Sequence, residues 1–388
     1  MKVVLDELKR VPSDDRQNGR HSSTNSAEKI SGGHGEVARQ QEIPPIEDLD
    51  LYDEDFYEDS SEEEVLDDDK YGKHEYLSAC DALHVVPLSQ ALKYLELDGM
   101  HLTHYGMGYK GLCALASALK VNRTVSTLRL GDNHLGPEAA VKLVEAISGN
   151  NSITELDLSR NRIGHEGCKA IAKLLAPKAS EIRHLNLSNN KLLDRDAVAL
   201  CEVLSNNTTM QELDMSSNLL AEKAGVAIGG MVQQNVGLKE IHLGWNCMRG
   251  KGCKALAEGL AGNVGIQVLN VSWNGMGDLG ATAFGEMLKV NTGLVELSAS
   301  GNGIGVEGAL ALAAGIGLSE SLAAVFLDQN DFRSEGGLAM KDAVERNKGL
   351  VMLRMENTNS PAGVRAHMDA LLNARLEQQE KETGTAFA

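Results

Sequence analysis

The chain has 388 residues and a formal net charge of −18, and 42% of its residues are hydrophobic whereas only 4% are aromatic. The charge is uneven: residues 42–70 hold fifteen Asp or Glu and one Lys, a net of −14, which leaves −4 for the rest. This acidic balance, with no basic patch in the sequence, excludes nucleic acid as an expected partner.

The first residues, MKVVLDELKR, contain no apolar stretch of signal-peptide length, and no window approaches the roughly 18 apolar residues of a membrane span. We therefore predict a cytoplasmic protein without membrane contact. Whether it associates with the cytoskeleton or a cilium, or lies in the nucleus, stays open. The six cysteines are predicted to be reduced, mostly as small core residues.

Residues 1–74 are predicted to be a disordered acidic arm, because they lack hydrophobic periodicity and cannot bury enough apolar surface to offset chain entropy. Leucines and aromatic residues stand among the acids, as at Leu51, Tyr52 and Phe56. The arm is either a solvated tail or a segment that docks on a basic partner surface.

Residues 75–96 show a helical pattern and are predicted to cap the fold that follows. An asparagine then recurs every 28 residues, with one step of 29, always after a phrase such as LDLSRN or LNVSWN. We expect these residues to form a structural asparagine ladder: Asn133, Asn161, Asn190, Asn218, Asn246, Asn274, Asn302 and Asn330.

Each phrase begins with the pattern L-x-x-L-x-L, which predicts a short strand, and an amphipathic helix of about a dozen residues follows the asparagine. Residues 97–360 therefore form stacked repeats, and residues 361–388 a C-terminal capping helix and tail. Neighbouring parallel strands lie about 4.8 Å apart, whereas helices need about 8–10 Å. The predicted fold is a curved α/β solenoid with parallel strands on the concave face and helices on the convex face.

These phrases resemble the leucine-rich repeat in its ribonuclease-inhibitor-like form of 28–29 residues. The phrases YLSAC at Tyr76–Cys80, VVPLS at Val85–Ser89 and LTHYGMGYKG at Leu102–Gly111 more closely resemble the leucine-rich repeat-containing protein 74 family. The resemblance implies a horseshoe-shaped solenoid and a non-enzymatic interaction protein.

No catalytic or metal-binding constellation stands out, and we predict no enzymatic activity, cofactor or metal. The pattern G-x-G-x-x-G occurs three times, beginning at Gly106, Gly275 and Gly303. All three copies occupy one phase of the repeat, where a tight strand-to-helix turn favours glycine, so we do not interpret them as dinucleotide sites.

The positions that flank the middle residue of each strand are predicted to face outward from the concave side. Several of them are acidic: Glu155, Asp157, Glu212, Asp214, Glu240 and Glu296. These acids either keep an exposed sheet face soluble or form a cradle for a basic helix or tail of a partner.

Trp245 and Trp273 are the chain's only tryptophans and lie 28 residues apart, each directly before an asparagine of the ladder. They should stack at the rim of the concave face, either as an exposed hot spot or as packing over a neighbouring loop. The predicted partner-binding residues are Glu155, Asp157, Glu212, Asp214, Glu240, His242, Trp245 and Trp273.

The leading hypothesis is a protein-binding scaffold, monomeric by itself, that displays a rigid concave surface. An alternative is a regulator of a small GTPase, since Ran GTPase-activating proteins are similar in repeat type and own an acidic tail, although theirs follows the repeats. A third reading is that the acidic arm binds basic residues of the same chain.

Overall fold

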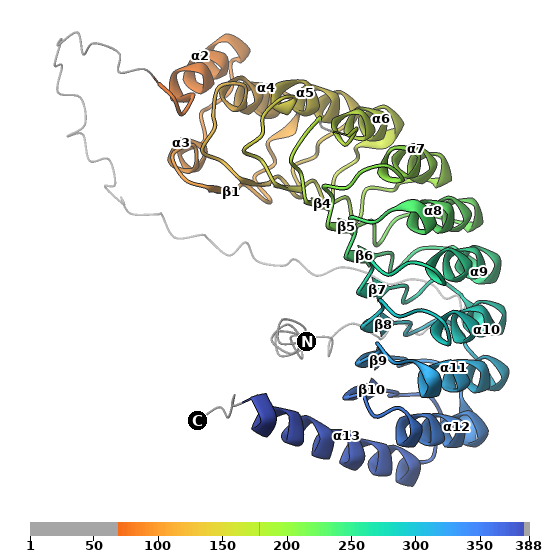
Figure 1. The fold of residues 1–388 in the computed structure, drawn as a ribbon. Helices are drawn as coiled ribbons and strands as arrows, with labels where there is room; N and C mark the ends of the chain where they lie inside the picture. The colour runs from red at the N-terminus through yellow and green to blue at the C-terminus, as the bar shows by residue number, and fades with distance from the viewer. Residues whose placement is uncertain (1–68, 178, 384–388) are drawn as a thin grey trace, which may run out of the picture. The chain divides into compact units, whose positions relative to one another are not determined.

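The structure is a computed structural model that describes residues 69–177 and 179–383, with side chains through residue 378. Residues 1–68 of the predicted arm therefore lie outside the described part. The described chain forms a curved stack in which strands line the inner side and helices the outer side (Figure 1). The predicted curved α/β solenoid is confirmed.

Ten three-residue strands pair in parallel and in chain order in one sheet of the described residues. They are β1 Gly99–His101, β2 Thr127–Arg129, β3 Glu155–Asp157, β4 His184–Asn186, β5 Glu212–Asp214, β6 Glu240–His242, β7 Val268–Asn270, β8 Glu296–Ser298, β9 Ala324–Phe326 and β10 Met352–Arg354. The middle residue of each strand is buried and pairs with the middle residue of the next, as Leu128 does with Leu156. Because side chains alternate along a strand, the first and third positions face the concave side.

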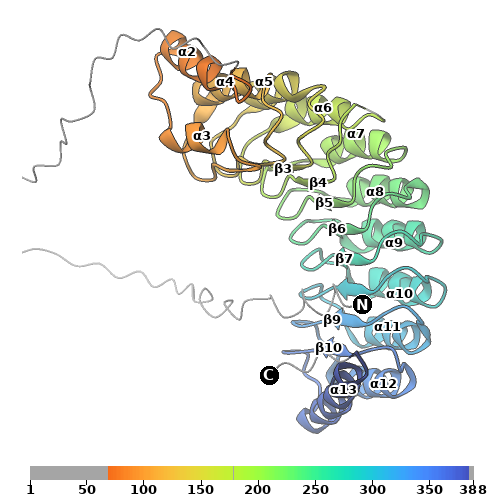
Figure 2. The same cartoon turned by 60° about the vertical axis from the view of Figure 1, so that its left-hand side comes forward.

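Helices alternate with the strands and form the outer layer, which Figure 2 shows from a second direction. Their buried faces are rich in Ala and Leu, which are good helix formers. They are α2 Lys73–Leu83, α3 Ser89–Tyr94, α4 Gly108–Leu119, α5 Pro137–Ile147, α6 Gly164–Leu174, α7 Asp194–Leu204, α8 Glu222–Gln234, α9 Arg249–Leu260, α10 Gly277–Leu288, α11 Val306–Leu318, α12 Arg333–Arg346 and α13 Ala362–Thr383.

The eight asparagines that follow the strands, here called the strand-end asparagines, are all buried. Asn218 is representative. Its Nδ2 donates to the carbonyl of Met215 in its own repeat at 3.0 Å and to that of Leu187 in the preceding repeat at 3.1 Å. Its Oδ1 accepts from the backbone N–H groups of Asn190 and Leu192 at 2.9 and 3.0 Å. One amide therefore satisfies backbone groups in two consecutive repeats.

A second series of buried asparagines, the helix-end asparagines, lies between each helix and the next strand: Asn122, Asn150, Asn207, Asn235, Asn263, Asn291 and Asn347. Asn235 donates to the carbonyls of Leu204 and Asn207 at 2.6 and 2.8 Å. Its Oδ1 accepts from the N–H groups of Gly237 and Leu238 at 2.9 and 2.8 Å. The sequence analysis did not recognise this series, because the buried residues Ser180 and Ser319 stand in two of its turns.

Arg375 of α13 ends the helix-end series. Its guanidinium donates to the carbonyls of Asn347 and Val344, both at 2.7 Å. These carbonyls lie 28 and 31 residues back, the same separations that Asn235 spans. The arginine therefore supplies to the last repeat the donors that a further repeat would have supplied.

Glycines bring helices α8 to α11 close together. An added Cβ on Gly229 would lie 2.4 Å from the carbonyl oxygen of Ala255, and one on Gly259 would lie 2.0 Å from the carbonyl oxygen of Gly229. Gly285 and Gly315 make the equivalent approach between α10 and α11, at 2.2 Å. The backbones of neighbouring helices meet where no side chain separates them.

The repeated glycine motif serves the turn into each helix. Gly275 and Gly277 have φ of 66° and 57°, in the left-handed region that favours glycine. The third glycine of the motif, Gly280, faces the core, since an added Cβ would lie 2.4 Å from Cγ of Met276. These contacts explain the motif structurally.

Replacing Asn218 by Ala should lower the free energy of unfolding by about 2 kcal/mol or more, because it leaves buried backbone groups of two repeats without partners. Exposed Asn151, for which Asn151→Ala should change little, is the control. Urea denaturation of both variants measures the difference, and equal midpoints would refute the bridging role of the strand-end asparagines.

Gly229 and Gly230 are adjacent in α8 but should respond in opposite ways to alanine. Gly229→Ala should destabilise the protein because the methyl group collides with α9. Gly230→Ala should stabilise it by about 0.5–1 kcal/mol through helix propensity, since an added Cβ there meets nothing within 4 Å. Thermal unfolding of the two variants measures this. A melting temperature raised by both would contradict the close helix approach.

Candidate interaction surface on the concave face

The outward positions predicted from the sequence are the first and third residues of strands β2–β10. Most of them are at least partly exposed, but Val268 is 9% exposed and Ala324 is fully buried. Ala324 lies in register between Glu296 and Met352, whose side chains are much longer than its methyl group. The concave face near β9 is therefore not the row of exposed side chains that the alternation predicts.

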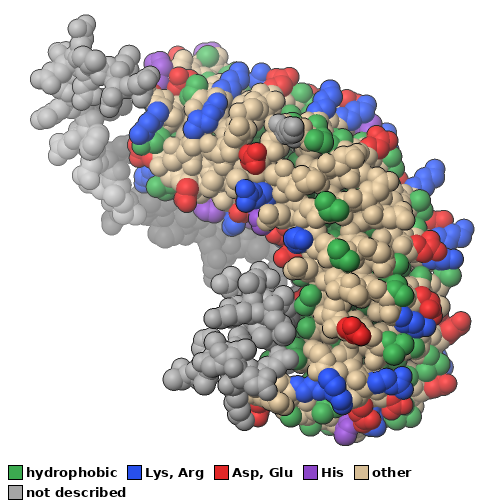
Figure 3. Space-filling model, viewed as in Figure 1, with side chains coloured by type: hydrophobic (Ala, Val, Ile, Leu, Met, Phe, Trp, Pro, Cys, Tyr) green, Lys and Arg blue, Asp and Glu red, His purple; other side chains and the backbone are tan. Residues whose placement is uncertain are grey.

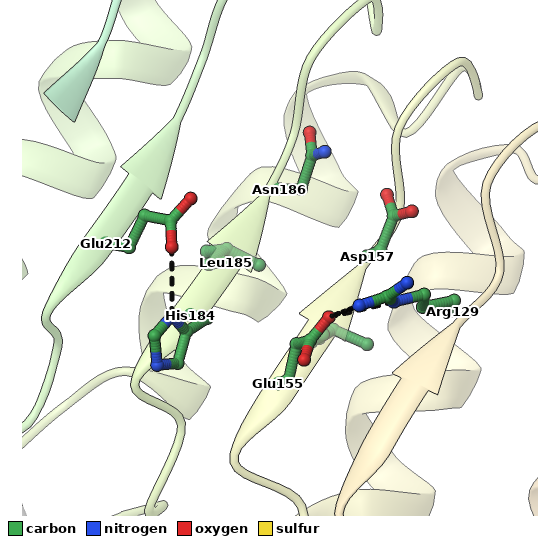
Figure 4. A pocket seen from close by; sticks show the side chains of 8 residues that line it. Arg129, Glu155, Asp157, His184, Leu185, Asn186 and Glu212 are labelled. Carbon is green, nitrogen blue, oxygen red and sulfur yellow. Dashed lines mark hydrogen bonds and ion pairs between the residues drawn. The ribbon is translucent and has the colours of Figure 1, made fainter. Parts of the chain in front are cut away.

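A hollow of about 410 Å³ lies on the concave face over strands β2 to β5 (Figure 4). Two ion pairs cross it from strand to strand. Nη2 of Arg129 lies 2.8 Å from Oε1 of Glu155, and Nδ1 of His184 lies 3.0 Å from Oε2 of Glu212. In this part of the face, basic side chains therefore offset the acids that the sequence analysis singled out. The hollow is lined by Arg129, Glu155, Leu156, Asp157, His184, Leu185, Asn186 and Glu212.

The third strand position has a structural duty as well as an exposed one. Oδ1 of Asp157 accepts from the backbone N–H of Ser159, and Oδ1 of Asp214 accepts from that of Ser216, both at 2.8 Å. Asn186 makes the same contact with Ser188 at 2.9 Å. These bonds hold the turn after the strand, so Asp157 and Asp214 present only part of their carboxylates to a partner.

His242 lies in the densest group of acids on the face. Its Nε2 is 3.9 Å from Oε1 of Glu212 and 3.8 Å from Oε2 of Glu240. Burial acts to lower the pKa of His242, but the hydrogen bond with Glu240 and the charges of Asp214, Glu212 and Glu240 outweigh it and raise that pKa above its ordinary value. The imidazole thus tends to carry a proton that the two glutamates share.

The same three residues have the composition of a metal site, since one ligand atom from each of Glu212, Glu240 and His242 lies within 4.8 Å of the others. A metal ion needs a neutral imidazole as ligand. The raised pKa of His242 favours a proton in that place. We therefore interpret the group as an ion-pair network.

Trp245 and Trp273 stack with ring centroids 4.5 Å apart and an angle of 11° between their planes. On its other side the ring of Trp273 lies against Gly301, where an added Cβ would come within 2.4 Å of it. In the preceding repeat the equivalent residue is the small Ser217. The outer side of Trp245 is consequently open, and this residue is 59% exposed.

Both tryptophans stand at a position where the fold requires a left-handed backbone. Their φ values are 58° and 57°, and the residue before every other strand-end asparagine also has positive φ. Asn and Gly tolerate this conformation, whereas bulky residues rarely adopt it. The repeat alone therefore does not account for tryptophan at these two positions.

The structure brings the predicted binding residues together in three places. Glu212, Asp214, Glu240 and His242 form one group on β5 and β6, Glu155 and Asp157 lie two strands away, and Trp245 and Trp273 follow β6 and β7. Sequence reasoning missed Arg129 and His184. The strand register was the available signal, because it places Arg129 beside Asp157 and His184 beside Glu212.

The cysteine thiols do not add a reactive centre to this face. Burial raises the pKa of Cys168, Cys201 and Cys253 to about 12, so these thiols stay protonated core groups. Cys247 is the exposed cysteine among the described residues. No helix of residues 69–177 and 179–383 combines the length and hydropathy that crossing a bilayer requires.

Seven segments of the chain match the family model described as Leucine Rich repeat: residues 121–144, 149–172, 181–201, 206–229, 234–257, 265–285 and 290–313. The chain is a leucine-rich repeat protein.

Among solved structures, the chain is similar to leiomodin-1 actin-binding site 2, with 20% identity over 35% of this chain and 79% of the other and a TM-score of 0.32. It is also similar to the tropomodulin C-terminal domain of Caenorhabditis elegans, with 12% identity over 50% and 99% of the two chains and a TM-score of 0.35. Similarity at this level carries no argument about a partner.

The imidazole of His242 should titrate above the ordinary histidine value of about 6.5. Its contribution to stability is then fully present below about pH 6.5 and is lost as the pH rises through the folded-state pKa. Glu240→Gln should lower that pKa, whereas Glu96→Gln, far along the chain, should not. NMR titration of the imidazole measures both, and an unchanged pKa in Glu240→Gln would disprove the shared proton.

Proposed function

We propose that the chain binds a partner protein with the tryptophan pair and the acidic group on β5 and β6. The observation that carries this is the open outer side of Trp245 at the end of a stacked column. An exposed aromatic ring held rigid by its neighbour loses little entropy on binding, and tryptophans at such places are frequent hot spots.

The chemistry of the surroundings favours a partner with basic residues. A guanidinium or ammonium group stacks well on an indole face, and acids nearby strengthen the attraction. Glu240 belongs to the strand that leads to Trp245, and Glu212 and Asp214 lie on the adjacent strand. A basic helix or tail is therefore the expected ligand of this surface.

The proposal gives the scaffold no catalytic step. It displays a surface that the two asparagine series hold in place, and the partner supplies the flexible part. The narrower resemblance to the leucine-rich repeat-containing protein 74 family and the small-GTPase alternative stay predictions. A GTP-hydrolysis assay with candidate GTPases distinguishes that alternative from simple binding.

The test replaces both tryptophans by asparagine, which suits the left-handed backbone. If the rings served only the fold, Trp245→Asn with Trp273→Asn would lower the stability. If they serve binding, the double variant should unfold at the same temperature or higher and bind at least about tenfold more weakly. The matched control is Val264→Asn, at a residue that is 71% exposed in the loop before β7.

A displayed random-peptide library, selected on the full chain, supplies the ligands for this comparison. Selected peptides should contain Arg or Lys, and their Kd follows from the intrinsic fluorescence of the only two tryptophans in the chain. Selection of uncharged peptides that bind the double variant as well as the wild type would refute the proposal.

A further inference from the structure

A second exposed surface lies where the strands turn into the helices, in repeats that precede the tryptophan pair. We call it the cationic hollow and define it by Arg160, Arg162 and Lys191. These residues stand directly before or after the strand-end asparagines Asn161 and Asn190. Because those asparagines point into the core, the flanking side chains point away from it. The hollow measures about 350 Å³ and is also lined by Asp132, His134, Asn161 and Asn189.

The three cations have no counter-charge in the described part of the chain. Arg160, Arg162 and Lys191 are exposed, and among residues 69–177 and 179–383 their side chains form no hydrogen bond or ion pair. The single acid that lines the hollow, Asp132, is bonded to His104, with Oδ2 2.6 Å from Nδ1.

Cations elsewhere on the body commonly have a carboxylate partner. Lys341 pairs with Glu345 at 2.9 Å, and Lys142 pairs with Glu145 at 3.4 Å. Acidic and basic side chains lie interspersed along the outer rim of the body in Figure 3. Three unpaired cations around one hollow, in a chain with a net charge of −18, depart from this pattern.

The fold does not require these charges. The same two positions of the repeat hold Gly301 and Gly303 around Asn302, and the position of Arg160 is held by Ser217 before Asn218. Arg160 and Lys191 even adopt left-handed backbones, with φ of 54° and 59°, which Gly or Asn would adopt more readily. The like charges repel one another, so their gathering needs a reason other than packing.

We propose that the cationic hollow binds a short acidic segment of a partner protein. Adjacent repeats lie about 4.8 Å apart, and an extended peptide advances about 3.3 Å per residue. The three cations of two adjacent repeats therefore match two or three carboxylates within about four residues of peptide. The strand that leads to Arg160 carries Glu155 and Asp157, which repel a longer polyanion such as a nucleic acid.

This surface is distinct from the tryptophan pair and selects the opposite charge. The test uses the full chain and a fluorescein-labelled peptide of about ten residues with a central run of Asp and Glu, alongside the same peptide with Asn and Gln. The triple variant Arg160→Asn, Arg162→Gln, Lys191→Asn removes the cations while keeping residues that suit the backbone. The control variant Lys120→Gln, Lys223→Gln, Arg346→Gln removes three exposed cations from other places and changes the net charge equally.

Fluorescence anisotropy should show binding of the acidic peptide that weakens as salt rises. The triple variant should bind it at least about tenfold more weakly, whereas the control variant and the double tryptophan variant should match the wild type. Three results would overturn the proposal: an equal loss in the control variant, equal binding of the Asn and Gln peptide, or tighter binding of single-stranded DNA. Far-ultraviolet circular dichroism confirms that the triple variant is folded.

Discussion

The architecture depends on the buried asparagine amide that joins consecutive repeats. A parallel sheet of three-residue strands satisfies few backbone groups, and the turns at both ends of each strand would leave buried N–H and C=O groups unpaired. An asparagine offers two donors and an acceptor in one small side chain, so it serves a turn on both sides at once. The strand-end asparagines do this after each strand, as Asn218 shows, and the helix-end asparagines do it before each strand, as Asn235 shows. Together they fix the backbone at both ends of the concave face.

This constraint releases the side chains between and beside the asparagines for other roles. Since the amides hold the left-handed turn, the residue before each strand-end asparagine is free to be Arg160, Ser217 or Trp245 at a modest conformational cost. The cost is offset by the rigidity of the stack rather than by the side chain itself. One backbone geometry therefore carries a cationic hollow in two repeats and an aromatic column in two later ones. The chain presents two surfaces of opposite preference along one edge.

The sequence predicted the repeat, the strand positions and the tryptophan stack because all three depend on the 28-residue period. The same period contained the helix-end asparagines, but Ser180 and Ser319 interrupt that series and hid it. Charge pairing was harder to predict. It depends on which side chains lie side by side in the sheet and on how far they reach, as with Arg129 and Glu155. The cationic hollow was missed for a related reason: its members are up to 31 residues apart, so no local run of basic residues announces them.

The helical layer determines how strongly the concave face closes around a ligand. Curvature arises because helices need more width than strands, and glycines reduce that need. The approaches of Gly229 to Ala255 and of Gly285 to Gly315 bring α8 to α11 together where the backbones touch, behind strands β6 to β8. Narrower spacing on the outside lowers the mismatch with the sheet and flattens this part of the solenoid. The tryptophan pair follows β6 and β7, so it stands on the part of the stack that glycine flattens. A flatter support leaves the outer side of Trp245 accessible to a helix or tail that a tightly curved face would exclude.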